Sequence, residues 1–212
     1  MVRLVEMSHK FFYVYEVKGD INEFNIFNES PIEIDGTPFN LVLKGSKQIN
    51  SLIRPYNFNE QEEIEGDIRF KNRKVPFKIR SKSKLLFVET SFQREKLKIL
   101  KFLNNKFQNL EIDLFTPSNE EEKTFICNTA EYDDFKVFMD DKIVRRGETN
   151  EDLCEGLMKD MELIEATLHL KIQERLITFY YYGNAIQFPH PKEEDIEGVI
   201  QTFENTMIVE AK

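Results

Sequence analysis

Six cations lie close together in one short stretch of a chain that is acidic as a whole. Residues 73–86, RKVPFKIRSKSKLL, hold six Lys or Arg and no acid, although the 212-residue chain has a formal net charge of -9. If residues 75–84 form one strand, the apolar Val75, Phe77 and Ile79 face the core. The opposite face then carries four cations, namely Lys78, Arg80, Lys82 and Lys84. Side chains on one face of a strand repeat at roughly 6.6–7 Å, a spacing that can follow a phosphate backbone.

A second basic row is predicted on the helix that follows, over residues 92–107. Its cations recur at the i, i+4 and i+7 spacing of one helix face. Its expected buried face consists of Leu97, Leu100, Leu103 and Phe107, and Thr90 and Gln93 have capping-box spacing at its start. Ten residues of the strand, its flanks and the helix are thus candidates for contacting a nucleic acid or a protein partner: Lys71, Arg73, Lys74, Lys78, Arg80, Lys82, Lys84, Arg94, Lys98 and Lys101.

The basic stretch has three interpretations. Contacts between such cations and phosphates would position a nucleic acid without reading its sequence. Lysines on an exposed or edge strand also discourage aggregation, and Pro76 suits an edge because it cannot donate a ladder hydrogen bond. The third interpretation is a docking surface for a protein. Because the overall acidity argues against indiscriminate binding of nucleic acid, we expect a protein partner or self-association, with DNA or RNA as the alternative.

The uneven charge distribution indicates a protein that acts through charged surfaces. Residues 44–107 hold 16 basic and 7 acidic residues, whereas residues 108–212 hold 10 basic and 24 acidic residues. Such asymmetry is typical of a polyanion-binding face, or of unlike surfaces that attract each other. We therefore predict a non-catalytic assembly or adaptor protein with a basic surface at about 71–101 and an acidic surface at about 118–162.

Motifs that would name a reaction are sparse. The acid-x-Lys fragment of a metal-dependent nuclease occurs twice, at 16–18 and at 134–136, without a convincing preceding acid in either case. No zinc, serine-hydrolase or phosphate-loop motif occurs. We therefore expect no catalytic residue, no metal site and no cofactor, and keep a nuclease as the second alternative.

The elements that must position the cations are antiparallel strands and helices. Aromatic and β-branched residues predict a strand at 10–17, and Asp35-Gly36 predicts a hairpin turn within 31–45. Residues 47–57 are assigned a short helix and residues 59–66 an acidic loop or the start of a new unit. Three strands then lead into the helix at 92–107.

The same order, three strands and then a helix, recurs over 166–208. Between the two copies, the segments 109–115 and 123–128 are predicted to be strands. This pattern indicates an α+β fold in which antiparallel meanders are each followed by a covering helix, arranged as a two-lobed pseudo-repeat. The expected lobes are 1–107, which contains the basic strand and helix, and the acidic 108–212, with one continuous domain as the alternative.

The remaining expectations concern the cell. The two cysteines lack any nearby Cys or His at ligand spacing, which favours a reducing compartment. Neither a signal-peptide pattern nor an apolar stretch of about 18 residues is seen. We therefore expect a cytoplasmic protein without a membrane span.

Overall fold

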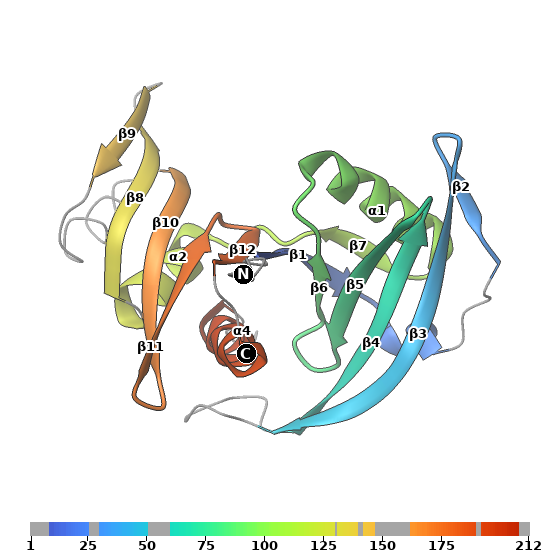
Figure 1. The fold of residues 1–212 in the computed structure, drawn as a ribbon, viewed down its shortest axis with the longest axis horizontal. Helices are drawn as coiled ribbons and strands as arrows, with labels where there is room; N and C mark the ends of the chain where they lie inside the picture. Colours follow the sequence, from blue (N-terminus) through green and yellow to red (C-terminus); the bar gives the residue numbers. More distant parts are fainter. Residues whose placement is uncertain are drawn as a thin grey trace, which may run out of the picture. The chain divides into compact units, whose positions relative to one another are not determined.

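The computed structural model describes residues 9–25, 30–50, 60–129, 131–139, 142–146, 162–189 and 192–207. The protein has the predicted α+β fold, in which the strands are mostly antiparallel (Figure 1). Packing divides it into two compact units. The N-terminal unit holds the described residues between 12 and 115, and the C-terminal unit holds the described residues 9–11 and 116–207. The predicted lobes 1–107 and 108–212 stay a prediction.

The N-terminal unit is a strand meander with one main helix. Its elements are β1 (Lys10–Lys18), η1 (Ile21–Asn25), β2 (Ile32–Ile34), β3 (Thr37–Asn50), β4 (Glu60–Phe70), β5 (Arg73–Arg80), β6 (Leu85–Glu89), α1 (Gln93–Lys106) and β7 (Glu111–Leu114). Strands β2 to β6 each pair antiparallel with the next. Strand β1 pairs antiparallel with both β6 and β7. The hairpin turn between β2 and β3 has positive φ at Asp35 and Gly36, as the favoured two-residue turn requires.

Phenylalanine rings fill the core between this sheet and α1. The ring of Phe39 on β3 stacks on Phe70 of β4 and on Phe102 of α1, with centroids 4.5 Å and 5.4 Å away. Phe24 of η1 stacks on Phe107 with centroids 4.1 Å apart. Because Phe carries no polar atom, these rings pack without needing a hydrogen-bond partner. One face of the meander is therefore apolar, and its other face is left for polar side chains.

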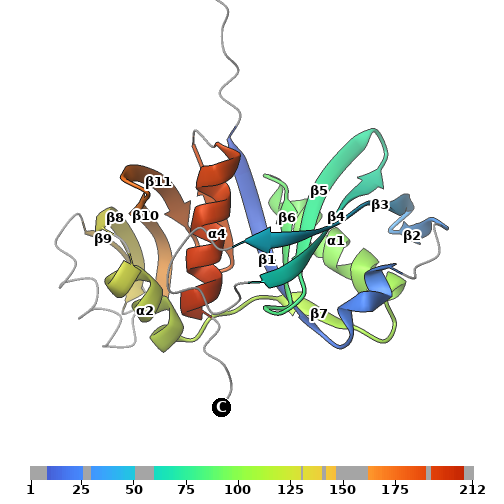
Figure 2. The same ribbon diagram turned by 90° about the horizontal axis from the view of Figure 1, so that it is seen from below.

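The C-terminal unit pairs an antiparallel sheet with two helices. Its elements are α2 (Asn119–Thr129), β8 (Glu131–Met139), β9 (Lys142–Arg146), β10 (Glu162–Ile172), β11 (Arg175–Tyr181), β12 (Ala185–Phe188) and α4 (Glu193–Met207). The strand order is β12-β11-β10-β8-β9. Helix α2 lies beside α4 (Figure 2), and Phe125 of α2 packs against Phe203 of α4 and Tyr181 of β11, with centroids 5.4 Å and 5.5 Å away.

Most predicted elements are confirmed, and three are wrong. Residues 60–66 of the predicted acidic loop at 59–66 belong to β4, which pairs on both sides. Residues 47–50 belong to β3 instead of a helix, and residues 51–57 lie outside the described part. Residues 123–128 lie in α2 instead of a strand. The predicted two-lobed pseudo-repeat is not confirmed. In the part of the chain that the structure describes, no helix is long and apolar enough to cross a membrane.

Candidate functional site

Strand β5 confirms the predicted core face of the basic stretch but not its row of four cations. Val75, Phe77 and Ile79 are buried, as alternation requires. The strand ends at Arg80, and Lys82 and Lys84 lie in the turn that follows. The buried amide of Gln61 organises this turn, because its Oε1 accepts a hydrogen bond from the backbone N–H of Lys82 at 3.3 Å. The prediction of four cations on one strand face is therefore wrong, since only Lys78 and Arg80 of the four lie in β5.

Arg80 is a buried residue with a buried counterion. It lies directly opposite Glu63 in the pairing of β4 with β5, and both side chains have no exposed surface. The Arg80 Nε atom is 2.8 Å from Glu63 Oε2, and Lys78 Nζ is 4.0 Å from Glu63 Oε1. A charge taken out of water needs such a partner, because desolvation disfavours the ionised form. Arg80 is thus built into the unit, out of reach of a ligand from solvent.

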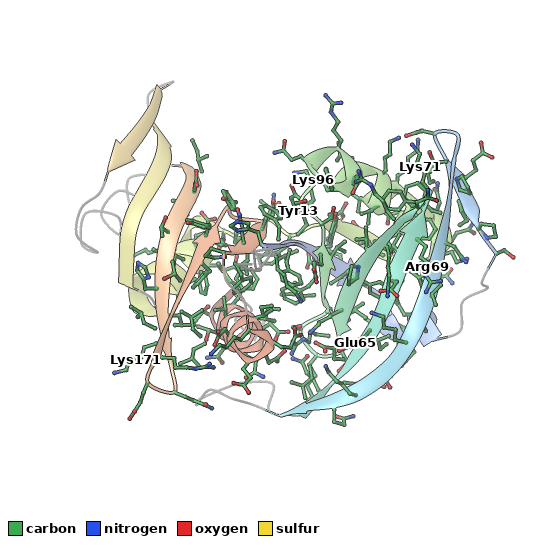
Figure 3. The ribbon with its side chains drawn as sticks, in the orientation of Figure 1. Tyr13, Glu65, Arg69, Lys71, Lys96 and Lys171 are labelled. Atoms are coloured by element: carbon green, nitrogen blue, oxygen red, sulfur yellow. The ribbon has the colours of Figure 1, made fainter. Side chains whose placement is uncertain are left out.

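The carboxylates of β4 are the feature that the sequence analysis missed. Glu63, Glu65 and Asp67 alternate along β4 and therefore share its polar face. Cations approach them from both neighbouring strands. Lys47 of β3 lies 3.0 Å from Glu63 Oε1 and 2.5 Å from Glu65 Oε1, while Asp67 pairs with Lys44 at 2.9 Å and with Lys74 at 3.3 Å. We call the three carboxylates Glu63, Glu65 and Asp67 the β4 carboxylate ladder. Figure 3 shows Glu65 and Arg69 along the strand.

The ion pairs of the ladder shift the pKa values of Glu65 and Lys47. The hydrogen bond from Lys47 lowers the pKa of the Glu65 carboxyl. Desolvation opposes the charge of Lys47, but its hydrogen bonds to Glu65 and Glu63 raise the pKa of this ammonium above its usual value. A β-bulge between Leu43 and Gly45 inserts one residue into β3. Bulges re-aim side chains, and this one shifts the alternation of β3 so that Lys47 lies opposite Glu63.

Helix α1 confirms the predicted buried face in part: Leu103 and Phe107 are buried as predicted, but Leu97 and Leu100 are not. Ile99, Phe102 and Leu103 are buried, whereas Leu97 is 60% exposed. The outward side instead carries Arg94, Leu97, Lys98 and Lys101, which we call the α1 outer face. Lys101 Nζ lies 2.8 Å from Asp35 Oδ1 of the β2–β3 turn. The hydrogen bond from Lys101, with a smaller contribution from the charge of Lys98, lowers the pKa of the Asp35 carboxyl.

The start of α1 is tied to β5 instead of being capped as predicted. The cap residue is Phe92, and no side chain caps it, so the Thr90–Gln93 capping box is wrong. Thr90 Oγ1 instead donates a hydrogen bond to Glu95 at 3.1 Å. Arg73 forms an ion pair with the same carboxylate and places its guanidinium 4.1 Å from the Phe92 ring centroid. Arg73 therefore joins strand to helix.

The remaining candidate cations lie at the turns. Lys71 is exposed in the β4–β5 turn with a positive φ of 52°. Lys82 and Lys84 are exposed at the opposite end of β5, which is roughly 23 Å away along an eight-residue strand. Lys96 of α1, which is not among the ten candidates, holds its ammonium 5.1 Å from the ring of Tyr13 (Figure 3). The ten predicted residues therefore form no single strip.

The predicted acidic surface is described only at its beginning. Helix α2 starts with a capping box in which Ser118 N–H donates to Glu121 Oε2 at 2.6 Å and Glu121 N–H donates to Ser118 Oγ at 3.3 Å. Glu122 is buried and accepts a hydrogen bond from Tyr181 Oη at 3.0 Å. Burial, followed by the charge of Glu122, raises the pKa of the Tyr181 phenol. The side chains of residues 127–162 lie outside the described part.

The two acid-x-Lys fragments provide no metal site that the structure describes. Lys18 pairs with Glu16 at 4.0 Å and with Glu111 of β7 at 3.6 Å, and these side chains are largely exposed. The side chains of the second fragment, 134–136, lie outside the described residues. Within the described ranges no group of three or more His, Cys, Asp or Glu is placed to hold a metal ion.

Comparisons with known proteins add no family to this geometry. No family model matches the chain, and a search of curated proteins finds no match. The functional argument therefore depends on the surfaces themselves.

Proposed function

We propose that this chain is a non-catalytic assembly or adaptor protein that docks a protein partner on the α1 outer face. The observation that carries the proposal is the exposed Leu97 among Arg94, Lys98 and Lys101. An apolar side chain surrounded by charged groups combines a desolvated anchor with a polar rim, as protein interfaces do. On this surface the cations outnumber the one nearby carboxylate, Asp35, so an acidic partner is the complementary one.

The pairing within β5 makes a nucleic-acid surface the weaker candidate. A strip that follows phosphates needs a continuous row of cations free of local acids. Lys74, Lys78 and Arg80 instead contact the β4 carboxylate ladder. Those carboxylates would repel a phosphate backbone laid along the sheet. On the α1 outer face, by contrast, the described ion pair is that of Lys101 with the exposed Asp35.

The acidic surface predicted at about 118–162 supplies a second part of the proposal. Glu120 and Glu121 in the first turn of α2 are its described members on the outside of the C-terminal unit. A surface of this charge on a second copy is one partner that would complement the α1 outer face. Self-association is accordingly included among the expected outcomes, next to a different acidic protein.

The test is an affinity purification of the full chain with matched variants, followed by sizing with light scattering. Arg94→Glu and Leu97→Ser are expected to lose a partner, or a second copy, that the unchanged chain retains. Lys171→Glu and Leu176→Ser alter an exposed cation and an exposed leucine of the C-terminal unit, and they are expected to retain it. Binding of the retained partner is then measured with both proteins purified.

Two results would refute the proposal. The first is a monomer at low and high salt, together with no partner whose retention depends on the α1 outer face. The second is steeply salt-dependent binding of a single-stranded DNA or RNA that Arg94→Glu and Lys98→Glu abolish, since that behaviour identifies phosphate contacts.

A further inference from the structure

We infer that the partner segment received by the α1 outer face is an acidic amphipathic helix, which sets one apolar side chain against Leu97 and carboxylates near Arg94 and Lys101. This inference rests on the proposed function and specifies the chemistry of its partner. Its basis is the arrangement of charge and apolar surface along α1.

The spacing on α1 matches the spacing on a second helix. Arg94 and Lys101 are seven residues apart, which is a rise of about 10.5 Å along the axis. Carboxylates seven residues apart on a partner helix have the same rise. An apolar residue between them, four positions after the first acid, lies on the same face. Such a helix lying along α1 therefore meets cation, leucine and cation in turn.

Asp35 shows how this face holds a carboxylate. Its Oδ1 lies 2.8 Å from Lys101 Nζ even though about half of each side chain is exposed. The same carboxyl also lies within the electrostatic influence of Lys98. Arg94 lies nearly two turns before Lys101, and the α1 outer face carries no acid of its own. A partner carboxylate near Arg94 would balance the end of the row that Asp35 does not serve.

Three residues of α1, Arg94, Lys96 and Leu97, are not the ones that helix stability alone favours at their positions. Arg94 and Lys96 lie in the first turn, where the helix dipole favours acids, and Glu95 is the single acid of the helix. Leu97 exposes 60% of its surface, whereas Ile99 and Phe102 of the same helix are buried. Local departures of this kind are expected where a surface serves binding.

The start of α1 is rigid enough to present this face in one orientation. Glu95 is held by Arg73 of β5 and by Thr90, and Tyr15 Oη donates a hydrogen bond to the carbonyl of Lys96 at 3.2 Å. At the other end, Asn104 exchanges hydrogen bonds with the backbone of Ile112 on β7, at 2.7 Å and 3.0 Å. A face fixed at both ends loses little conformational entropy when a partner binds.

The probe is a synthetic Ala-rich peptide of about 20 residues, long enough to be helical. It carries Glu at two positions seven apart and Leu four positions after the first Glu. A control peptide of the same composition moves the Leu to the opposite helix face. Binding of each labelled peptide to the full chain is followed by fluorescence anisotropy at about 0.15 M salt, where the Debye length is about 8 Å. A labelled 20-nucleotide oligo-dT is the third probe.

The ordered peptide is expected to bind about tenfold more tightly than the control peptide, since a buried leucine contributes about 1.5 kcal/mol or more and 1.4 kcal/mol is tenfold. Leu97→Ser is expected to remove that tenfold difference, while Leu176→Ser preserves it. Equal binding of both peptides, an unchanged preference in Leu97→Ser, or tighter binding of oligo-dT at this face would overturn the inference. If binding of the purified partner is still lost when the α1 outer face is changed, such a result refutes only the inference that the partner segment is an acidic helix. If that binding is not lost, the proposed function fails as well.

Discussion

Two sets of cations in the N-terminal unit have the same residue types and opposite environments. Arg80 of β5 is fully buried beside Glu63, and Lys78 and Lys74 also contact carboxylates of β4. Arg94 and Lys98 lie on the α1 outer face, where the exposed Asp35 pairs with Lys101 and lies within the electrostatic influence of Lys98. The comparison shows that the side chains on the neighbouring strand determine whether a cation forms a structural ion pair. The β5 cations hold a sheet together, and the helix cations lie on the surface that we propose as a docking site.

The largest expected effect comes from removing the buried cation. Arg80→Met leaves the Glu63 carboxylate without its closest counterion, and breaking a buried pair costs about 3–5 kcal/mol. We expect the lower end of that range, because Lys47 still lies 3.0 Å from Glu63 Oε1. Urea unfolding of Arg80→Met measures the loss. A change below about 0.5 kcal/mol, the size of an ordinary surface substitution, would erase the distinction between the two sets of cations.

Removing both partners sharpens the same comparison. Glu63→Leu combined with Arg80→Met replaces an ion pair with apolar side chains, which is often close to neutral. The double variant is therefore expected to unfold at higher urea than Arg80→Met alone, although it lacks one more native residue. A double-mutant cycle in urea gives the coupling energy. Strictly additive losses would mean that the two side chains do not stabilise each other.

Glu65, the partly exposed middle residue of the β4 carboxylate ladder, predicts a smaller, pH-dependent effect. Lys47 lowers the pKa of Glu65 in the folded state, so the stabilisation by Glu65 is present above its unfolded value of about 4.5 and is lost as pH falls through the folded value. Because Glu65 is partly exposed, we expect less than about 1 kcal/mol.

Lys47→Met is the variant that tests this pH dependence. It should raise the pKa of Glu65, as followed by the carboxyl carbon in an NMR titration, and should flatten the loss of stability below pH 4.5. Glu65 titrating at an unchanged pH in this variant would show that the ion pair does not form in solution.

The smallest expected effect belongs to the α1 outer face. Arg94→Met and Lys98→Met remove cations from a solvated helix surface, and such substitutions usually change the free energy of unfolding by no more than about 0.5 kcal/mol. Urea unfolding next to Arg80→Met makes the contrast direct. A loss above about 2 kcal/mol in either helix variant would place these cations in the fold and not on a docking surface.

The sequence was a good guide where a regular pattern meets a single packed face. Val75, Phe77 and Ile79 alternate on a strand covered on one side, and all three are buried. The final helix is similar in that Ile196, Phe203 and the apolar residues between them are buried, although polar residues such as Gln201 are buried too. In both elements the apolar residues lie on one face, so no second apolar face competes with it for burial.

Helix α1 shows where periodicity stops being decisive. Its apolar residues cover a wide arc, and both Leu97 with Leu100 and Ile99 with Phe102 fit helical spacing. The choice depends on the ring of Phe39 on β3, which stacks on Phe102, and no local pattern contains that contact. In α2 a local signal was available, since Ser118 and Glu121 have capping-box spacing, but the apolar run at 125–127 was read as a strand.

The acidic first part of strand β4, residues 60–66, could not be predicted from its own residues. An acidic segment with few apolar side chains has the composition of a loop. Glu63 is buried because Arg80 and Lys47, 17 and 16 residues away in sequence, lie on the two strands that pair with it. That information resides in the register between strands. The same register places Lys74, Lys78 and Arg80, three of the ten predicted cations, beside carboxylates of β4.

The most direct test compares two pairs of cations among the ten predicted residues. Arg94→Glu with Lys98→Glu changes the α1 outer face, and Lys82→Glu with Lys84→Glu makes the same change of charge in the β5–β6 turn. Affinity for the co-purified partner, or for the ordered acidic peptide, is measured at about 0.15 M salt so that remote charges are screened. We predict a loss of at least about tenfold for the helix pair and of no more than about twofold for the turn pair. Equal losses in the two variants would contradict the account, because they would show a diffuse basic field in place of a defined docking surface.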